Sequence, residues 1–103
     1  MTFNRKPGCV YMMTTASNTA LYTGVTSNLR ARVWQHQHPT PQSKCFTALY
    51  HCTKLVYYRW FDDVTHAITE EKRIKAGSRR AKEELVTSQN PQWRDLSPEA
   101  AEM

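Results

Sequence analysis

The sequence is short of acidic residues, glycines and long apolar runs, and each shortage excludes a class of protein. Its 9 Asp and Glu are outnumbered by 14 Lys and Arg in 103 residues, which leaves a formal net charge of +5. The three glycines form no glycine-rich loop of the kind that cradles a nucleoside triphosphate. No apolar run approaches the ~18 residues of a membrane-spanning helix, so we expect no membrane partner.

Cysteine is also scarce. The three cysteines, Cys9, Cys45 and Cys52, lack the CxxC spacing of a metal or redox motif. Free thiols in a reducing compartment are the simplest interpretation. Residues 1–8 are polar and lack the apolar centre of a secretory signal, so we expect a cytoplasmic protein.

The remaining composition is that of one ordinary globular domain. Hydrophobic residues make up 40% of the chain and charged residues 22%, which is unlike a disordered chain. At this length a single, modest core is expected. The excess of basic residues favours an anionic partner, with nucleic acid as the first candidate.

Strand-forming residues are concentrated in three segments, 9–13, 20–26 and 55–61. The first two are expected to form an antiparallel hairpin with a turn at Ser17 and Asn18. The third segment is almost continuously apolar, which is typical of a central strand covered on both faces.

Helices are expected between and after these strands, each with a capping residue before it and a breaking residue after it. They span about residues 29–38, 64–76 and 79–87. Gly77 suits the C′ position of the second helix, and residues 98–103 are expected to form a flexible tail. The order of elements predicts an α+β fold, with three strands and helices beside them.

One carboxylate interrupts the apolar face of the second expected helix. Apolar residues lie at i, i+3, i+4 and i+10 counted from Val64, and Glu71 fills the slot at i+7. A buried carboxylate needs a partner or a metal. Glu71 is therefore either a metal ligand at the mouth of a cleft, or a structural carboxylate that pairs with Lys75, one turn further on, or lies at the edge of the apolar stripe. The helix alone favours the ion pair.

Two further patterns are compatible with a ligand site. Arg32 and His36 are four residues apart, so they project from one helix face and could clamp a phosphate or simply be solvated. Tyr11 and Tyr22 lie in the middle of strands, where a structural role is the default. Gly24 faces the same side as Tyr22, and a glycine within a strand suggests that another group approaches closely.

Basic residues are densest between positions 72 and 82, which indicates either a track for a phosphate backbone or a solvated helical face. The candidate basic contacts to nucleic acid are Lys44, Lys72, Lys75, Arg79 and Arg80. Trp34, Tyr50 and Trp60 could stack on exposed bases, although packing in the core or at its rim is the commoner fate of such residues.

Taken together, these residues resemble the GIY-YIG nuclease superfamily. The segments that carry the resemblance are Cys9-Val10-Tyr11, Tyr22-Thr23-Gly24 with the following Arg32 and His36, Leu55-Val56-Tyr57-Tyr58, residues 67–75, and residues 90–96. The closest group is the small, stand-alone subfamily related to the N-terminal nuclease domain of the bacterial excision-repair incision subunit. The resemblance covers residues 7–97 and implies a sandwich with a three-stranded antiparallel sheet flanked by helices. Cys9-Val10 and Thr23 depart from the residues of the family's name.

The resemblance implies a divalent-metal-dependent endonuclease that acts on DNA in repair or recombination. Glu71 would bind one Mg²⁺ or Mn²⁺ ion. Tyr11 would position or deprotonate the attacking water, with Tyr22 in support. Arg32 would neutralise charge on the scissile phosphate, and His36 would hydrogen-bond the phosphate or share the role of base. The choice between Tyr11 and His36 as general base stays open.

The same resemblance adds Gly24 and Asn90 to the expected contacts with nucleic acid. The alternative function is a non-catalytic nucleic-acid-binding module that retains the fold, and a weaker one is a protein-interaction adaptor. The sequence does not reveal whether the DNA is branched or nicked, whether a protein partner directs the chain to it, or the oligomeric state.

Overall fold

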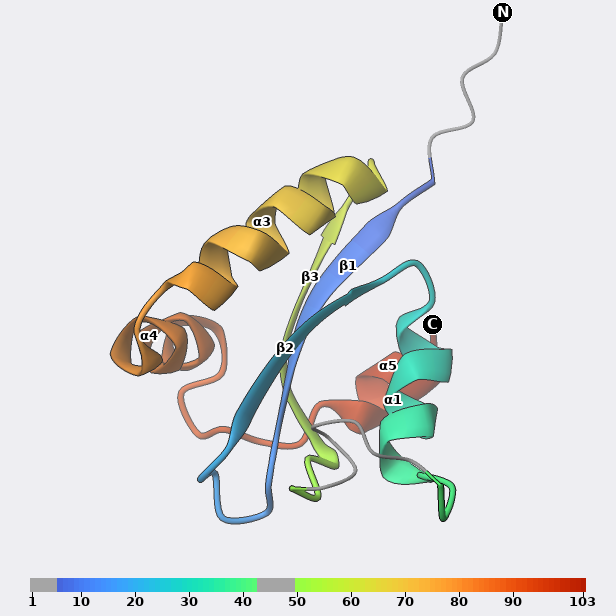
Figure 1. Cartoon of the computed structure of the whole chain (residues 1–103), viewed down its shortest axis with the longest axis vertical. Coiled ribbons are helices and arrows are strands. Elements are labelled where there is room, and N and C mark those ends of the chain that lie inside the picture. Colours follow the sequence, from blue (N-terminus) through green and yellow to red (C-terminus); the bar gives the residue numbers. More distant parts are fainter. Residues whose placement is uncertain (1–5, 43–49) are drawn as a thin grey trace, which may run out of the picture.

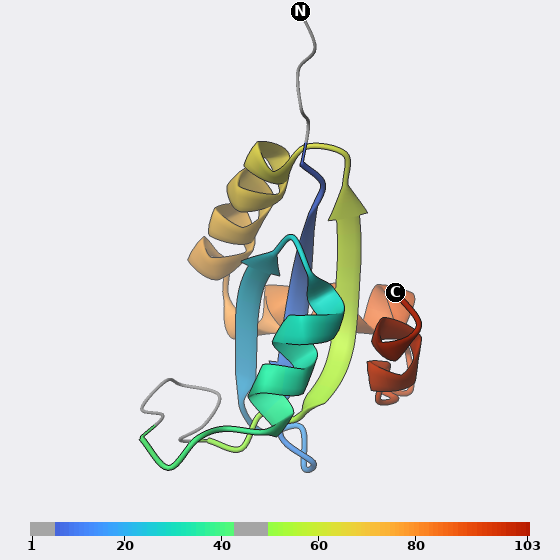
Figure 2. The same cartoon turned by 90° about the vertical axis from the view of Figure 1, so that its right-hand side faces the viewer.

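The strand β1 (Gly8–Thr14) forms the middle of a three-stranded antiparallel sheet, between β2 (Leu21–Thr26) and β3 (Lys54–Phe61). Figure 2 shows the three strands side by side. The computed structural model describes residues 6–42 and 50–103. Asn18, in the hairpin between β1 and β2, has a φ of 60°, a left-handed conformation that Asn tolerates. The predicted hairpin and the three-stranded antiparallel sheet are confirmed.

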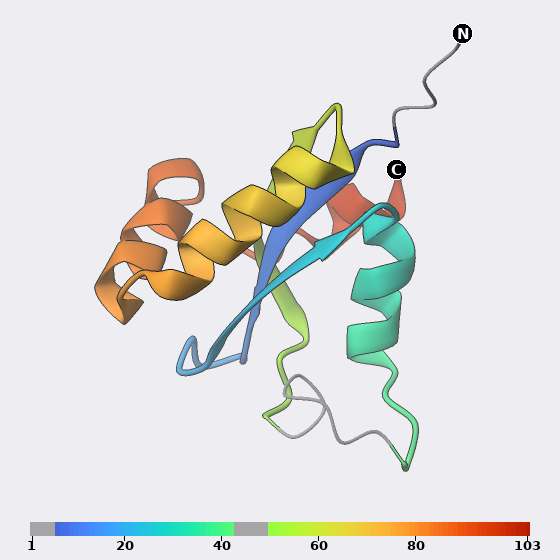
Figure 3. The same ribbon diagram turned by 45° about the horizontal axis from the view of Figure 1, so that its top comes forward.

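Helices cover both faces of this sheet and complete an α+β fold (Figure 1). α1 (Leu29–Gln37) and α5 (Ser97–Ala101) lie on one face. α3 (Val64–Ala76) and α4 (Arg79–Gln89) lie on the other face. In Figure 3, α3 runs obliquely across the strands, with α1 beyond the other side of the sheet. The site on α1 and the basic helices are therefore separated by the sheet.

Local capping residues begin the three longer helices. Asn28, Asp63 and Ser78 each accept a hydrogen bond from a backbone N–H in the first turn, at 3.1, 2.9 and 3.0 Å. These caps agree with the predicted helix starts. The prediction of a C′ position for Gly77 is wrong by one residue, because Gly77 is itself the C-cap of α3 and has an extended backbone with a φ of −79°.

The core consists of two clusters, one on each face, because side chains alternate along the strands. In β1, Cys9, Tyr11 and Met13 face α1 and α5, while Val10 and Met12 face α3 and α4. All seven residues of β1 are buried. The central strand therefore contributes to both clusters, and it supplies a tyrosine to the α1 face.

The prediction that residues 55–61 form the central strand is wrong. β3 is an edge strand, and β1 has neighbours on both sides. The apolar run of β3 reflects helices on both faces rather than its position in the sheet. Leu55 packs on the α1 face, whereas Val56 and Tyr57 pack on the α3 face, where the pairing with β1 shifts register.

The flexible tail expected for residues 98–103 is also corrected by the structure. α5 begins at Ser97, and Ala100 is buried in the cluster on the α1 face. The backbone N–H of Leu96 donates to the carbonyl of Leu55 at 2.7 Å, which anchors the segment before the helix. Ala100 is too small for its burial to be visible in the sequence pattern. Within the described part of the chain, no helix is long and apolar enough to cross a membrane.

Candidate active site

Three rings meet on the α1 face of the sheet, and each comes from a different element. Tyr11 lies on β1, Tyr22 on β2 and His36 on α1. The Tyr11 hydroxyl is 2.7 Å from His36 Nε2. The ring centroids are 6.1 Å apart for the two tyrosines, 5.6 Å for Tyr11 and His36, and 5.4 Å for Tyr22 and His36. Residues that are 25 positions apart in the chain are thus brought into one hydrogen-bonded group.

Burial sets the protonation of this group. Burial and the nearby Arg32 charge lower the pKa of His36 from 6.5 to about 4, so the imidazole is neutral at pH 7. Burial, reinforced by the Tyr22 hydroxyl and partly offset by Arg32, raises the pKa of Tyr11 well above its ordinary value. Both groups are therefore neutral, and the tautomer of His36 decides which of them donates the hydrogen bond: the phenol donates when the imidazole proton is on Nδ1. At pH 7 the site therefore holds a neutral phenol next to a neutral imidazole, and Tyr11 is not a tyrosinate.

Arg32 lies half-buried beside these rings. Burial opposes its charge, but the hydroxyls of Tyr11 and Tyr22 outweigh that penalty and raise the pKa of Arg32. Its Nη1 donates to Gln35 Oε1 at 2.9 Å, so Gln35 helps to hold the guanidinium in place. A fixed cation beside a neutral imidazole suits the binding of a phosphate group.

Gly24 makes room for Tyr11. The two residues are paired across β1 and β2, and a Cβ on Gly24 would lie 2.6 Å from both Cζ and Oη of Tyr11. No real Cβ atom tolerates such a contact. The close approach that the glycine predicted is therefore that of the Tyr11 phenol. Gly24 is buried, so its role in the fold is to position Tyr11, and the expected contact with nucleic acid has no support here.

Glu71 lies on α3, the helix that packs on the sheet face opposite α1. Its Oε1 is 3.0 Å from Lys75 Nζ, and its side chain is only 12% exposed. This ion pair is the alternative that the helix pattern favoured. The neighbouring Glu70 is paired with Arg73, whose Nη2 donates to Glu70 Oε2 at 2.9 Å. The structure thus brings Tyr11, Tyr22, Arg32 and His36 together, and the meeting of Glu71 with them stays a prediction.

The basic residues after position 72 are mostly engaged within the chain. Arg79 donates to the backbone carbonyls of Thr19 and Asn18 at 3.0 and 3.2 Å, which ties α4 to the β1–β2 turn. Arg80 pairs with Glu84 at 3.2 Å. Lys72 is exposed on α3. A phosphate track on these helices would therefore have to compete with acidic and carbonyl partners.

Asn90 and Lys44 are two further residues that were expected to contact nucleic acid. Asn90 is 3% exposed, and its Nδ2 donates to the carbonyls of Val56 and Arg94 at 3.1 and 2.9 Å. Its Oδ1 accepts from the Arg94 N–H at 3.0 Å, so the fold by itself accounts for the amide. Lys44 lies outside the described residues.

A model of the GIY-YIG catalytic domain matches residues 7–84, which run from β1 into α4. The chain belongs to the GIY-YIG family. No curated protein and no solved structure matches the chain significantly. Members of the GIY-YIG family are nucleases, so the domain implies DNA as the substrate and hydrolysis as the type of reaction.

GIY-YIG nucleases generally depend on a divalent cation. Among residues 6–42 and 50–103, no group of three or more His, Cys, Asp or Glu side chains could hold a metal ion. Mg²⁺ does not require such a group, because it is commonly bound through one or two carboxylates together with waters and substrate phosphates. The mostly buried carboxylate of Glu71 fits this pattern of binding.

One feature of α1 escaped the sequence analysis. Trp34 and His38 stack with ring centroids 4.2 Å apart and an angle of 16° between their planes. The i, i+4 spacing of the two rings was a usable signal for this contact. Packing in the core or at its rim was the commoner fate expected for Trp34, and this expectation is wrong, because the residue is 58% exposed.

Proposed function

We propose that this chain is a divalent-metal-dependent endonuclease that hydrolyses phosphodiester bonds of DNA, with a role in repair or recombination. The observation that carries the proposal is the hydrogen bond of 2.7 Å between the Tyr11 hydroxyl and the neutral His36, with the Arg32 guanidinium beside it. Tyr11 and His36 form a route for a proton, and Arg32 is an anion-binding group in the same largely buried site. Hydrolysis of a phosphodiester requires both.

In this mechanism Tyr11 and His36 act together. Attack of water on phosphorus forms one P–O bond and releases a proton, which passes to Tyr11 Oη as the phenolic proton moves to His36 Nε2. The low pKa of His36, about 4, keeps the imidazole neutral at pH 7, and its Nδ1-protonated tautomer accepts the phenolic proton at Nε2. His36 is thus the final proton acceptor, and Tyr11, which is fully buried in this structure, relays the proton to it.

Arg32 binds the scissile phosphate, and its charge stabilises the extra negative charge as the P–O3′ bond breaks. Tyr22 packs edge-on against His36 at 5.4 Å and fixes the orientation of the imidazole. Glu71 would hold a divalent cation, which would supply Lewis-acid stabilisation of the leaving oxygen.

Cleavage assays of variant proteins test this function. Purified protein is incubated with plain, nicked and branched DNA in Mg²⁺ or Mn²⁺, next to Arg32→Ala and Glu71→Gln. We expect each substitution to lower the cleavage rate by about a hundredfold or more. The matched control is Glu84→Gln. Glu84, like Glu71, is a helical glutamate in an i, i+4 ion pair, but it is the more exposed of the two. Equal activity in all four proteins would mean that a contaminant cleaves the DNA.

A second candidate is a nucleic-acid-binding module without catalysis. It is favoured by the ion pair of Glu71 with Lys75 and by the position of α3 on the face opposite α1. Binding of DNA without cleavage in either metal, weakened by Arg32→Ala, is the result that this function predicts. Cleavage that depends on Glu71 rules it out.

A further inference from the structure

An aromatic platform stands on the outer surface of α1. Trp34 is 58% exposed, and one side of its indole is covered by the His38 imidazole, 4.2 Å away and nearly parallel. His38 is itself held in place, because both its backbone N–H and its Nδ1 lie 2.9 Å from the Trp34 carbonyl. The held imidazole therefore supports one face of the indole. An exposed indole is a surface on which another flat ring can stack.

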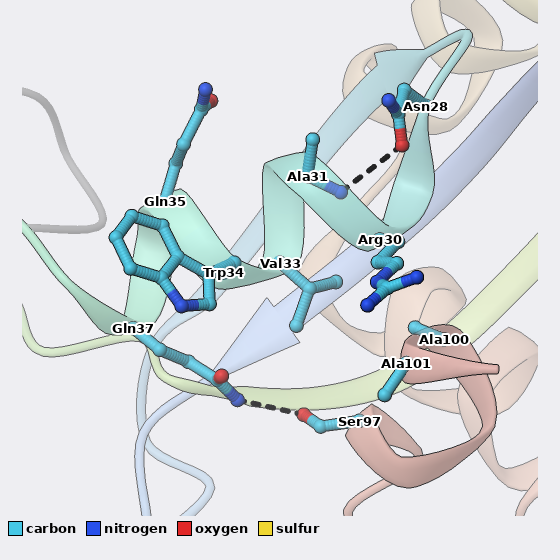
Figure 4. Close-up of a pocket in the computed structure, with 10 residues that line it drawn as sticks. All are labelled: Asn28, Arg30, Ala31, Val33, Trp34, Gln35, Gln37, Ser97, Ala100 and Ala101. Atoms are coloured by element: carbon cyan, nitrogen blue, oxygen red, sulfur yellow. Dashed lines mark hydrogen bonds between the residues drawn. The ribbon is translucent and has the colours of Figure 1, made fainter. Parts of the chain in front are cut away.

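The platform borders a groove of about 580 Å³ between α1 and α5 (Figure 4). Trp34 lines this groove and His38 does not, so the groove touches parts of the indole that His38 leaves uncovered. Val33 lies between Trp34 and Arg30 in Figure 4, and Ala100 and Ala101 close the far side. A hydrogen bond of 2.9 Å from Gln37 Nε2 to Ser97 Oγ holds the two helices together at this point.

The chemistry of the groove favours one kind of occupant. Among the described residues that line it, Arg30 carries the sole charge. The amides of Asn28, Gln35 and Gln37 also line it, each with one of its two polar atoms already hydrogen-bonded within the chain. An aromatic plate, a guanidinium and amides together match a nucleotide, which offers a ring, a phosphate and polar base edges. An acidic lining, which would favour a basic peptide, is not what these residues provide.

The groove and the candidate active site lie on different sides of one helix. Arg32 and Trp34 are two residues apart, which places them about 200° apart around α1. A phosphate at Arg32 and a base on Trp34 would therefore belong to segments that pass on either side of the helix. Paired DNA cannot present a base in this way, since its bases are stacked inside the duplex.

We propose that the Trp34 platform and the Arg30 groove bind an unpaired base of a single-stranded segment next to the scissile duplex. This inference rests on the proposed function, and it narrows the substrate to DNA with a junction between paired and unpaired strands. The base stacks on the indole, and Arg30 pairs with the adjoining phosphate.

The test measures binding without divalent metal, so that cleavage does not interfere. The probes are a fluorescein-labelled blunt duplex and the same duplex with a single-stranded thymidine tail, titrated in EDTA and followed by fluorescence anisotropy. We expect wild-type protein to prefer the tailed DNA. Trp34→Ala should weaken binding of the tailed duplex by about tenfold and leave the blunt duplex within about twofold. Trp34→Tyr, which keeps an aromatic ring, should retain the preference.

Trp60→Ala is the matched control, because Trp60 is another exposed tryptophan, on β3. It should leave the preference for the tail intact. The proposal is overturned if Trp34→Ala weakens both DNAs equally or neither. It is also overturned if wild-type protein shows no preference and Trp34→Ala converts a dimer to a monomer, because the groove then holds a second copy of the chain. If the protein prefers the tailed duplex but cleaves no DNA, this inference stands and the proposed catalysis is wrong. If the protein cleaves DNA without preferring the tailed duplex, the proposed catalysis stands and this inference is wrong.

Discussion

At the level of single residues, burial determines what the candidate site can do. The His36 side chain is 6% exposed and Tyr11 is fully buried, so neither group easily carries a charge. Their hydrogen bond satisfies both polar atoms. The proposed mechanism uses this neutral pair, with Arg32 as the nearby charge.

The pH dependence of stability tests the state of His36. The unfolded imidazole has a pKa of 6.5 and the folded one a pKa of about 4. Between these values the unfolded state binds more protons, so the free energy of unfolding falls as the pH is lowered from 6.5 to 4. In urea titrations, wild type should lose about 3 kcal/mol more than His36→Gln over this window. The exposed His66→Gln should follow wild type, and parallel curves for wild type and His36→Gln would contradict the assignment.

Substitution of Gly24 tests whether this glycine makes the room that the Tyr11 ring needs. In Gly24→Ala the new Cβ would meet the phenol at 2.6 Å, so the ring must move. We expect the free energy of unfolding to fall by about 1–3 kcal/mol, together with a loss of cleavage because Tyr11 leaves His36. Gly77→Ala is the matched change, since its φ of −79° suits alanine, and it should alter stability by less than about 1 kcal/mol. Full activity and stability in Gly24→Ala would disprove this role.

At the level of elements, α4 is joined to the sheet through its first residue. The guanidinium of Arg79 reaches the carbonyls of the β1–β2 turn, whereas Arg80, the next residue, is 88% exposed at its side chain and pairs along the helix surface. The two adjacent arginines therefore make different contacts: Arg79 binds the β1–β2 turn, and Arg80 pairs with Glu84 on its own helix. The sequence alone presents them as equivalent members of a basic stretch.

Alanine substitution separates the two arginines. Arg79→Ala should lower the free energy of unfolding by about 1 kcal/mol, because two carbonyl hydrogen bonds to a charged donor are lost at a partly exposed site. Arg80→Ala removes an exposed ion pair and should have almost no effect. Chemical denaturation of both variants measures the difference. An equal effect of the two substitutions would mean that the contact of Arg79 with the turn adds nothing to stability.

At the level of the whole molecule, the folded unit extends beyond the matched family domain. The family match ends at residue 84, inside α4, whereas the packing continues to α5. Ala100 is 1% exposed and joins Leu29 and Val33 in one cluster. The last helix therefore completes the α1 face and the groove beside Trp34.

Truncation tests this extent of the fold. Removal of residues 97–103 uncovers apolar surface of α1 and breaks the bond from Gln37 to Ser97, so we expect a loss of about 2 kcal/mol in the free energy of unfolding. Removal of the exposed residues 102–103 alone is the control and should be neutral. Thermal and urea unfolding of both proteins give the answer. An unchanged stability after the longer deletion would restore the picture of a flexible tail.

The fold was predictable wherever its signals are local. Caps at Asn28, Asp63 and Ser78, the proline after α1 and the strand composition mark the elements, because each depends on neighbouring residues. The same holds for the pairing of Glu71 with Lys75, which are one helical turn apart. The order of strands in the sheet was not predictable in this way, since an apolar strand looks the same at the centre and at a helix-covered edge.

The sequence by itself determined the three strands, the three longer helices and the family, and it named Tyr11, Tyr22, Arg32 and His36, which the structure brings together. Only the tertiary structure decided that Tyr11 is hydrogen-bonded to His36, that Arg79 binds a turn 60 residues away, and that Trp34 stays exposed. The physical reason is that burial and long-range contacts depend on which surfaces meet after folding. Local patterns fix backbone conformation and side-chain faces, but the environment of a titratable or aromatic group arises only when distant elements pack together.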